Sequence, residues 1–431
     1  MNKAFLISKT GNSKKLIVAA WTCCIAISST AQNQSRDELL KTLMESNPKQ
    51  FSHILNDQSG LQVQIIYSEI NRDKKNKVQF RDHFYNVDDQ RYFYPASTVK
   101  LPIAILALEK IRELAIPGLD RNSTMITGAA GERQTEVFND PSSADGRPSI
   151  AHYIKKILLV SDNDAFNRLY EFLGQEYINN RLHAMGYTDI QILHRLDISL
   201  PEAENRWTNP LRFYDSTGKL LYEQPAVKSK MIYANRQTKM GKGFMREGQL
   251  VNEPFDFSAK NRMTLSALHN ILRSIIFPEA MNASQRFRLA PDDYLFLRKY
   301  MSMMPGESKR PAYDSTDAWD TYVKFLYYGA EKNKPEPGIR IFNKPGDAYG
   351  FMIDAAYIVN FNNKTDCIIS AVIHCNSDGI YNDDRYEYKT IGLPFMKALG
   401  QLIMTYEQTR VRKRQPDLLS FLINYSDVEI R

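Results

Sequence analysis

The sequence predicts an α/β (α+β) fold: an antiparallel five-stranded sheet flanked by helices, with an all-helical subdomain inserted between its strands. Three observations support this prediction. Two strand patterns come early in the chain, a block of helical patterns follows, and three further strand patterns precede a closing helix. Short turns join successive strands, which favours antiparallel pairing, and strands from both ends of a chain can share one sheet around an insertion.

The first element is a polar, helix-prone stretch within residues 33–60. The first strand is predicted at Leu61–Tyr67, where polar and apolar residues alternate, and the second at Val78–Tyr85. A charged turn at residues 71–76 joins them. These strands begin the sheet layer.

Helical spacing starts at Thr98 and continues to about Leu114, with apolar residues on nearly every side, which predicts a centrally buried helix. Two more helices are predicted at Ile150–Val160 and Asp164–Leu173. Residues 215–260 are rich in Lys, Gly, Gln and Asn without a clean period, so we expect a long surface excursion there.

The last part of the chain returns to the sheet. Helical patterns at residues 265–276 and 292–303 precede three strand patterns and a closing helix. These four final elements are predicted at Ile339–Asn343, Phe351–Asn360, Asp366–Cys375 and Tyr388–Tyr406. The sheet layer therefore takes residues of about 60–92 and 262–410, and the helical layer residues of about 97–261.

The composition is that of a soluble globular protein. The 431 residues are 43% apolar and 24% charged, enough for a full core in one large domain or two to three smaller ones. The formal net charge of +7 includes four lysines within residues 1–31; without them 52 basic residues face 49 acidic ones. This weak excess does not favour a nucleic-acid partner, which usually shows as a concentrated basic face.

The N-terminus resembles a secretory signal. Lys14 and Lys15 precede an apolar run from Leu16 to Ile27, and small residues follow up to Ala31. We expect cleavage near Ala31, a mature domain of residues 32–431, and a periplasmic or secreted location. The apolar run is short for a membrane span, so no stable span is expected after cleavage, with an N-terminal anchor as the alternative.

Cysteine and histidine spacing predict neither disulfides nor metal. Cys367 and Cys375 lie in one predicted strand, eight residues and roughly 26 Å apart, too far to bridge. The seven histidines are scattered without metal-ligand spacing, so no metal or other cofactor is expected.

A first short motif is Ser97-Thr-Val-Lys100. On a helix that begins at Ser97, a residue three positions on lies over the same face, which places an amine beside a hydroxyl. Such an amine can act as the base that a weak nucleophile requires, and the helix N-terminus offers N–H groups to an oxyanion. The alternative is that Ser97 caps a buried helix.

A second and a third motif follow in the chain. The Ser161 hydroxyl can relay a proton and the Asn163 amide can hold a carbonyl, although Ser161 with Asp164 also resembles a capping box. Lys344-Pro-Gly346 ends a strand and either brings a cation to the sheet edge, with the N–H of Asp347 as an oxyanion donor, or forms an ordinary turn.

Together the three motifs resemble the Ser-x-x-Lys, Ser-Asp-Asn and Lys-Thr-Gly signature of class A β-lactamases and penicillin-binding serine hydrolases. The resemblance covers roughly residues 60–405. The sequence from Tyr94 to Pro102 looks like the family's entry into the helix that carries its Ser-x-x-Lys motif, and Gly350–Val359 looks like its next strand. The 183-residue step from Ser161 to Lys344 is longer than is usual there and requires residues 215–260 and extra sequence near 306–338.

The resemblance implies a β-lactamase/transpeptidase-like fold and a role for each motif. Ser97 would attack an amide or ester carbonyl, Lys100 would take its proton, and Ser161, helped by Lys344, would protonate the leaving nitrogen. The substrate would be a β-lactam or a cell-wall peptide. The alternatives are a D,D-peptidase or esterase-like relative with poor β-lactam turnover, and a non-catalytic module that binds cell-wall peptides.

The sequence departs from the family where the acyl group must be released. No Glu-x-x-Leu-Asn appears in the corresponding stretch, so the deacylating base is Asp197 by spacing, or Glu202 or Glu204 by a different loop path. Pro345 lacks the hydroxyl that would help to bind a substrate carboxylate. Gly346 and Asp347 are predicted to line the substrate site, where Asp347 adds a negative charge.

Overall fold

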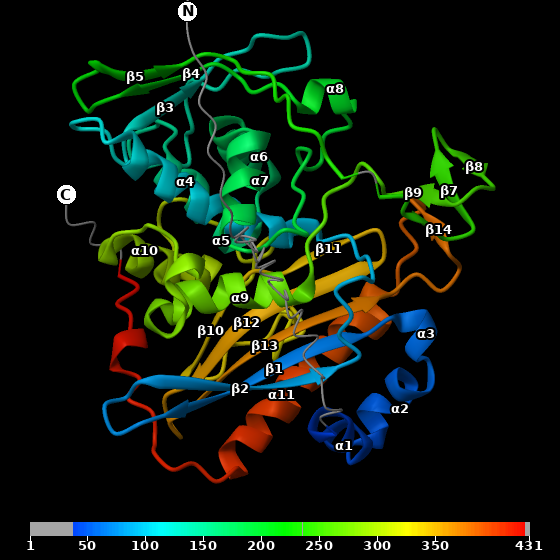
Figure 1. The fold of residues 1–431 in the computed structure, drawn as a ribbon. Coiled ribbons are helices and arrows are strands. Elements are labelled where there is room, and N and C mark those ends of the chain that lie inside the picture. Colours follow the sequence, from blue (N-terminus) through cyan, green and yellow to red (C-terminus); the bar gives the residue numbers. More distant parts are fainter. Residues whose placement is uncertain (1–37, 235, 427–431) are drawn as a thin grey trace, which may run out of the picture. The chain divides into compact units, whose positions relative to one another are not determined.

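The computed structural model describes residues 38–234 and 236–426. They fall within one compact unit, Arg36–Arg431, and Figure 1 shows their sheet with helices on both faces. The predicted signal peptide and its cleavage position lie outside the described residues. No helix among the described residues is both long and apolar enough to cross a membrane.

The central sheet has five long strands, all paired antiparallel, in the order β10, β12, β13, β1, β2. Their bounds are β10 Ile339–Asn343, β12 Phe351–Asn360, β13 Thr365–His374, β1 Gln64–Arg72 and β2 Val78–Tyr85. A sixth short strand, β11 (Gly346–Ala348), also pairs with β12, beyond the end of β10. The predicted antiparallel five-stranded sheet flanked by helices is confirmed, with β11 as an addition. The inserted subdomain is not all-helical as predicted, because residues 124–127, 211–214 and 220–224 pair as a small sheet within it.

Alternate strand residues supply two separate cores. Ile65 belongs to the core under α1, α2 and α11, whereas Ile66 belongs to the core that α9 and the helical layer share. The helices of the first core are α1 (Leu39–Glu45), α2 (Pro48–Asn56) and α11 (Leu393–Thr409). Helices α9 (Leu265–Ile276) and α10 (Pro291–Ser302) lie on the opposite side. The central strands β12 and β13 are therefore buried on both faces, whereas the edge strand β2 exposes Gln79 and Arg81.

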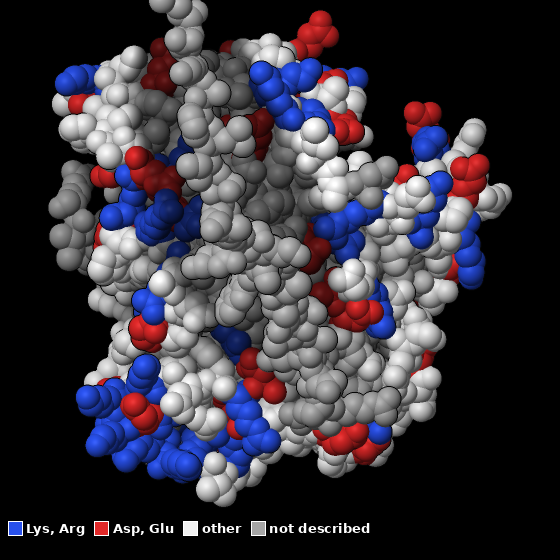
Figure 2. Space-filling model, viewed as in Figure 1, with Lys and Arg blue, Asp and Glu red and all other residues white. Residues whose placement is uncertain are grey.

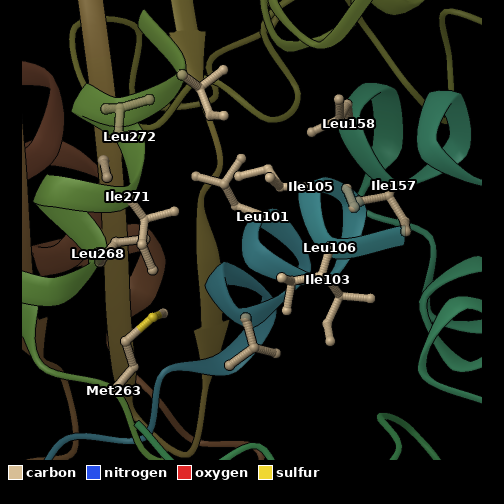
Figure 3. Close-up of a cluster of buried hydrophobic side chains, with 14 of the residues drawn as sticks. Leu101, Ile103, Ile105, Leu106, Ile157, Leu158, Met263, Leu268, Ile271 and Leu272 are labelled. Carbon is tan, nitrogen blue, oxygen red and sulfur yellow. The ribbon is translucent and has the colours of Figure 1, made fainter. Parts of the chain in front are cut away.

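The helical layer is built around α4 (Lys100–Leu114), which is buried continuously from Lys100 to Glu109. Figure 3 shows its leucines and isoleucines between α9 and α5 (Ile150–Val160). Helices α6 (Asn163–Leu173) and α7 (Gln175–Ala184) complete the layer. The prediction of a centrally buried helix is confirmed. Because α4 is packed on all sides, the position of Lys100 at its N-terminus is fixed.

The described residues of 215–260, predicted as a long surface excursion, are mostly exposed or half-buried, and they also contain short strands that the sequence did not indicate. This stretch contributes to small sheets, in the orders β3-β4-β5, β6-β9 and β14-β7-β8. Their bounds are β3 Thr124–Thr127, β4 Leu211–Tyr214, β5 Leu220–Gln224, β6 Lys239–Met240, β7 Gly243–Arg246, β8 Gln249–Val251, β9 Phe255–Asp256 and β14 Ile380–Tyr381. Strands of two to five residues are too short to show a period in the sequence.

Single helical turns connect the longer elements. They are α3 Gln58–Leu61, α8 Glu202–Asn205, η1 Ala96–Val99, η2 Pro278–Ala280, η3 Ala283–Gln285, η4 Pro305–Glu307, the π-turn η5 Tyr388–Gly392 and η6 Leu419–Phe421. The predicted closing helix therefore begins as η5 and continues as α11.

Cys367 and Cys375 are buried and free, which confirms that they do not bridge. Figure 2 shows basic side chains gathered at one end of the unit, where the β1–β2 turn lies beside the segment after α11. A hydrogen bond from the Asn76 amide to the carbonyl of Asp417 joins these two segments.

Candidate active site

Ser97 lies in the tight turn η1 that leads into α4. The preceding residue, Ala96, has φ of 47°, a left-handed conformation that a non-glycine residue rarely adopts. Such strain is concentrated at functional sites, where the surrounding fold maintains it. The Ser97 side chain caps neither η1 nor α4; its Oγ accepts a hydrogen bond from Lys100 Nζ at 2.9 Å. The capping alternative is therefore wrong for this serine.

The Lys100 amine is the centre of the site. Its side chain is fully buried, and four oxygens lie within hydrogen-bonding distance of Nζ. These oxygens are Ser97 Oγ at 2.9 Å, Ser161 O at 2.5 Å, Ser161 Oγ at 3.1 Å and Asn163 Oδ1 at 2.6 Å. An ammonium has only three protons for them, so the amine is shared among the serine and asparagine side chains and the backbone.

Burial lowers the pKa of Lys100 from its ordinary 10.5 to about 7, against the opposing effect of the carboxylates of Asp162, Asp347 and Asp197. The amine is therefore close to half neutral at neutral pH. A neutral amine next to a hydroxyl can accept its proton, which an ordinary lysine ammonium cannot do.

Ser161 ends α5 in a left-handed conformation, with φ of 61°. Its side chain does not cap the next helix: Asp162 is the N-cap of α6 and accepts a hydrogen bond from the N–H of Ala165 at 2.8 Å. The alternative that Ser161 caps this helix is therefore wrong, because the cap is the next residue, Asp162. This leaves the Ser161 hydroxyl turned towards the lysines, 2.8 Å from Lys344 Nζ and 3.1 Å from Lys100 Nζ.

Lys344 reaches the same hydroxyl from the sheet. Its buried Nζ donates to Ser161 Oγ and, at 2.7 Å, to the carbonyl of Pro345. Burial lowers the pKa of Lys344 well below its ordinary value, and the neighbouring Lys100 lowers it further, while Asp354 and Asp347 oppose the shift. Two amines from different layers therefore share one serine hydroxyl.

Strand β11 runs against the backbone of the Ser97 turn. A Cβ atom on Gly346 would lie 2.6 Å from the Ser97 nitrogen and 2.9 Å from the Thr98 nitrogen, distances that no side chain tolerates against backbone. Glycine at this position thus allows the sheet edge and the start of α4 to meet. The edge continues at Asp347, which pairs with Met352.

The Asp347 carboxyl lies at the mouth of this site. It still meets solvent, but the surrounding protein displaces enough water to raise its pKa, an effect that Lys344 and Lys100 oppose. The structure thus brings together Ser97, Lys100, Ser161, Asn163, Lys344, Gly346 and Asp347.

A buried polar network under Lys344 was missed by the sequence analysis. Lys324 Nζ donates to Asn343 Oδ1 at 2.8 Å, and the Asn343 amide donates to both oxygens of Asp354 at 3.0 Å. Burial lowers the pKa of Lys324 to about 7 and raises that of Asp354 to about 6. Asn343 and Asp354 lie on neighbouring strands, and only strand pairing reveals their proximity.

A sequence model of the beta-lactamase enzyme family matches residues 48–406. The chain belongs to this family. The resemblance predicted from the three motifs is confirmed. No curated protein matches the chain.

Several solved structures are similar to this family member. A β-lactamase from Xanthomonas campestris has 13% identity, covers 85% of this chain and 98% of its own, and gives a TM-score of 0.47. A β-lactamase from Burkholderia phymatum has 13% identity, with 86% and 100% coverage and a TM-score of 0.46. PBP-A, solved as an acyl-enzyme complex with penicillin G, has 14% identity, with 85% and 96% coverage and a TM-score of 0.45.

Within this β-lactamase-family chain, the three candidate acids differ in surroundings. Asp197 is exposed, has φ of 58°, and its charge acts on the Lys100 amine. Glu202 instead forms an ion pair with Arg206 at 2.8 Å, and Glu204 lies 3.7 Å from Arg133. Only Asp197 among the three is linked electrostatically to the site.

Buried side chains hold the loop that carries Asp197. The Asn167 amide donates to the carbonyl of Leu196 at 2.9 Å and accepts from its N–H at 2.8 Å. Arg195 forms a buried ion pair with Glu171 at 2.9 Å. The loop is therefore fixed on both residues that precede Asp197, although the aspartate itself faces solvent.

Proposed function

We propose that this chain is a serine hydrolase of the β-lactamase type, which opens a β-lactam or a related amide or ester through an acyl-enzyme on Ser97. The observation that carries the proposal is the contact between Ser97 Oγ and the buried Lys100 amine, 2.9 Å apart, with the Lys100 pKa at about 7. Membership of the beta-lactamase enzyme family supports it.

In acylation, Ser97 Oγ forms a bond to the substrate carbonyl carbon while its proton moves to Lys100. Negative charge then collects on the carbonyl oxygen, where the backbone N–H groups of Ser97 and Asp347 stabilise it. The closeness of Gly346 to the Ser97 nitrogen supports this pairing of donors.

The tetrahedral intermediate collapses when the bond to the leaving nitrogen or oxygen breaks. Ser161 donates the proton that the leaving group requires. Its oxygen then receives a proton from Lys100 or Lys344, whose Nζ atoms both lie within 3.1 Å of it. The Asn163 amide holds Lys100 in line through its Oδ1.

Release of the acyl group needs a water and a base, a role we propose for Asp197. An aspartate is one methylene shorter than glutamate, and small misplacements of a base reduce rates strongly. We therefore expect fast acylation and slow turnover. This favours, as a second candidate, a D,D-peptidase or esterase-like activity with poor β-lactam turnover.

The test combines mass spectrometry with a chromogenic β-lactam and a D-Ala-D-Ala peptide. A penicillin should leave a covalent adduct that disappears in Ser97→Ala, and Lys100→Ala should slow its formation by about 10²- to 10⁴-fold. A non-catalytic module would instead bind these ligands without an adduct, with an affinity that Lys100→Ala leaves intact. Absence of both acylation and ester hydrolysis would refute the enzyme proposal.

We also propose that the protein acts in the periplasm or outside the cell, because residues 1–31 have the pattern of a secretory signal. N-terminal sequencing of the protein from its host is expected to begin near residue 32. A mature protein that retains its first residues would contradict this.

A further inference from the structure

Five exposed cations form a surface at the end of the unit where the β1–β2 turn lies beside the segment that follows α11 (Figure 2). We call this surface the basic patch. None of the five forms an ion pair with a carboxylate of residues 38–234 or 236–426. They are Lys74, Lys75 and Lys77 on the turn, and Lys413 and Arg414 on the segment.

Hydrogen bonds hold the two segments side by side, so the basic patch is one surface. The Asn76 amide donates to the carbonyl of Asp417, and its Oδ1 accepts from the Asp417 N–H, both at 3.3 Å. The Arg410 guanidinium donates to Asn71 Oδ1 at 3.0 Å and to the carbonyl of Ile70 at 3.1 Å. The fold therefore brings together cations from segments 340 residues apart in the chain.

The carboxylates on these segments only partly offset the five cations. Asp73 accepts the backbone N–H groups of Lys75 and Lys77 at 2.8 and 3.0 Å, and its charge acts on Lys77 and Arg414. The second carboxylate, that of Asp417, is exposed. Five cations against these two carboxylates leave a local excess of three positive charges.

The buried charges behind the basic patch do not cancel this excess. Arg72 forms a buried ion pair with Asp366 on β13 at 2.5 Å. The buried Glu407 carboxylate is shared by Arg410, at 2.6 Å, and Arg412. Because two arginines share one carboxylate, this cluster adds one more positive charge, and the field of this end attracts anions.

Exposed apolar side chains accompany the cations on the segment after α11. Val411 is 96% exposed and Leu419 is 71% exposed. Phe421 anchors the segment next to them, since its buried ring lies 4.8 Å from that of Tyr357 between centroids. Cations and apolar side chains on one fixed surface match a bilayer interface, where lipid phosphates pair with the cations and the acyl boundary accepts the apolar groups.

We propose that the basic patch binds the surface of a bilayer that contains anionic phospholipid. A polyanion such as nucleic acid would pair with the cations but leave Val411 in water, whereas a lipid interface accommodates both. The binding is peripheral and requires no membrane-spanning helix. This inference does not depend on the proposed enzymatic function.

The basic patch lies at the end of the sheet opposite to the candidate active site. Asp347 pairs with Met352 near the start of β12, whereas the patch adjoins the other end, where Asn360 pairs with Thr365 and β1 runs out. Eight residues of β12 separate these ends, roughly 27 Å. Docking through the patch therefore holds the protein by the end remote from Ser97.

The experiment measures co-sedimentation with vesicles of phosphatidylcholine alone and of phosphatidylcholine with roughly one-third phosphatidylglycerol, at about 0.1 and 0.5 M NaCl. Residues 1–31 are removed, because they lie outside the compact unit Arg36–Arg431 and their apolar run would bind lipid by itself. We expect binding to the phosphatidylglycerol vesicles only, and weaker binding at the higher salt concentration.

Two triple variants of equal net charge test the basic patch, with circular dichroism to check that both are folded. Lys74→Gln/Lys75→Gln/Lys77→Gln should weaken binding by about fivefold for each cation removed, or roughly 10²-fold in all. The control removes three exposed lysines elsewhere and should change binding by less than about threefold. Its substitutions are Lys49→Gln in α2, Lys219→Gln in the β4–β5 turn and Lys242→Gln between β6 and β7.

Val411→Ser tests the choice of a lipid partner. It should weaken vesicle binding by about tenfold and leave the salt dependence unchanged, because it removes an apolar contact and no charge. Equal binding to both kinds of vesicle, or an equal loss in both triple variants, would overturn the proposal. Binding to a DNA duplex or to polyphosphate without binding to the phosphatidylglycerol vesicles would also overturn it, because the surface would then recognise soluble polyanions.

Discussion

The protonation state of Lys100 gives the sharpest test of the mechanism. With a pKa of about 7, the neutral fraction of this amine rises from roughly one-tenth at pH 6 to roughly nine-tenths at pH 8. If neutral Lys100 takes the proton from Ser97, the second-order rate of acylation should rise about tenfold over this interval and then level off. Lysine at its ordinary pKa of 10.5 would instead give a rate that still climbs at pH 9.

A single substitution should move this pH profile in a known direction. Among the carboxylates that raise the Lys100 pKa, Asp162 has the largest effect, and it is also the N-cap of α6. Asp162→Asn removes the charge but retains a good capping residue, so the helix is preserved. Loss of the charge should lower the Lys100 pKa, shift the rising limb to lower pH, and increase the rate measured at pH 6.

The assay is stopped-flow acylation by a chromogenic β-lactam or aryl ester from pH 5.5 to 9.5, with circular dichroism to confirm that the variant is folded. A rate that does not change between pH 6 and 8 would refute the role of Lys100 as the base. A limb that moves to higher pH in Asp162→Asn would refute the electrostatic reasoning.

Three further outcomes follow from the structure. Gly346→Ala should lower acylation by about 10²-fold or more, because its methyl group would push β11 from the Ser97 turn; unchanged kinetics would exclude the close approach. Asp197→Asn should prolong the acyl-enzyme without slowing its formation, measured as burst and steady-state rates, and equal loss in both phases would contradict a deacylation role. Leu106 is fully buried, so Leu106→Ala should lower the free energy of unfolding by about 2–5 kcal/mol, measured by chemical denaturation. A loss below about 1 kcal/mol would contradict its place in the core.

Stability should also depend on pH in a defined direction. Lys100 and Lys324 both have a pKa of about 7 in the fold and near 10.5 when unfolded, so the unfolded state binds more protons between these values. Their burial penalty is complete below pH 7 and is relieved as pH rises, by up to about 1.4 kcal/mol per pH unit for each group. Urea denaturation at pH 7 and 9 should therefore show greater stability at pH 9, and Lys324→Met should reduce this dependence. A lower stability at pH 9 in the parent chain would contradict the argument.

The regular elements were largely readable from the sequence. Alternation placed β2 at Val78–Tyr85, and helical spacing placed α5 at Ile150–Val160 and α9 at Leu265–Ile276, with the observed bounds. The strands within residues 215–260 were not readable, because elements of two to five residues have no period and depend on partners such as β4 and β14.

The site divides in a similar way. Short motifs identified Ser97, Lys100, Ser161 and Lys344, since their chemistry requires specific residue types in a specific order. The network of Lys324, Asn343 and Asp354 could not be predicted, because its members are separated in sequence and only the pairing of β10 with β12 brings two of them together.

The meeting of Gly346 with the Ser97 turn has a consequence for how the protein responds to ligands. One half of the reacting groups is carried by α4 and the α5–α6 junction, and the other half by the sheet edge. A covalent inhibitor that contacts both groups of residues would link the helical layer to the sheet edge. Amide hydrogen exchange should then slow both in α4 and in β10–β12. Inhibitor binding would therefore be detected as protection of backbone amides in both layers, including amides far from the bond to Ser97.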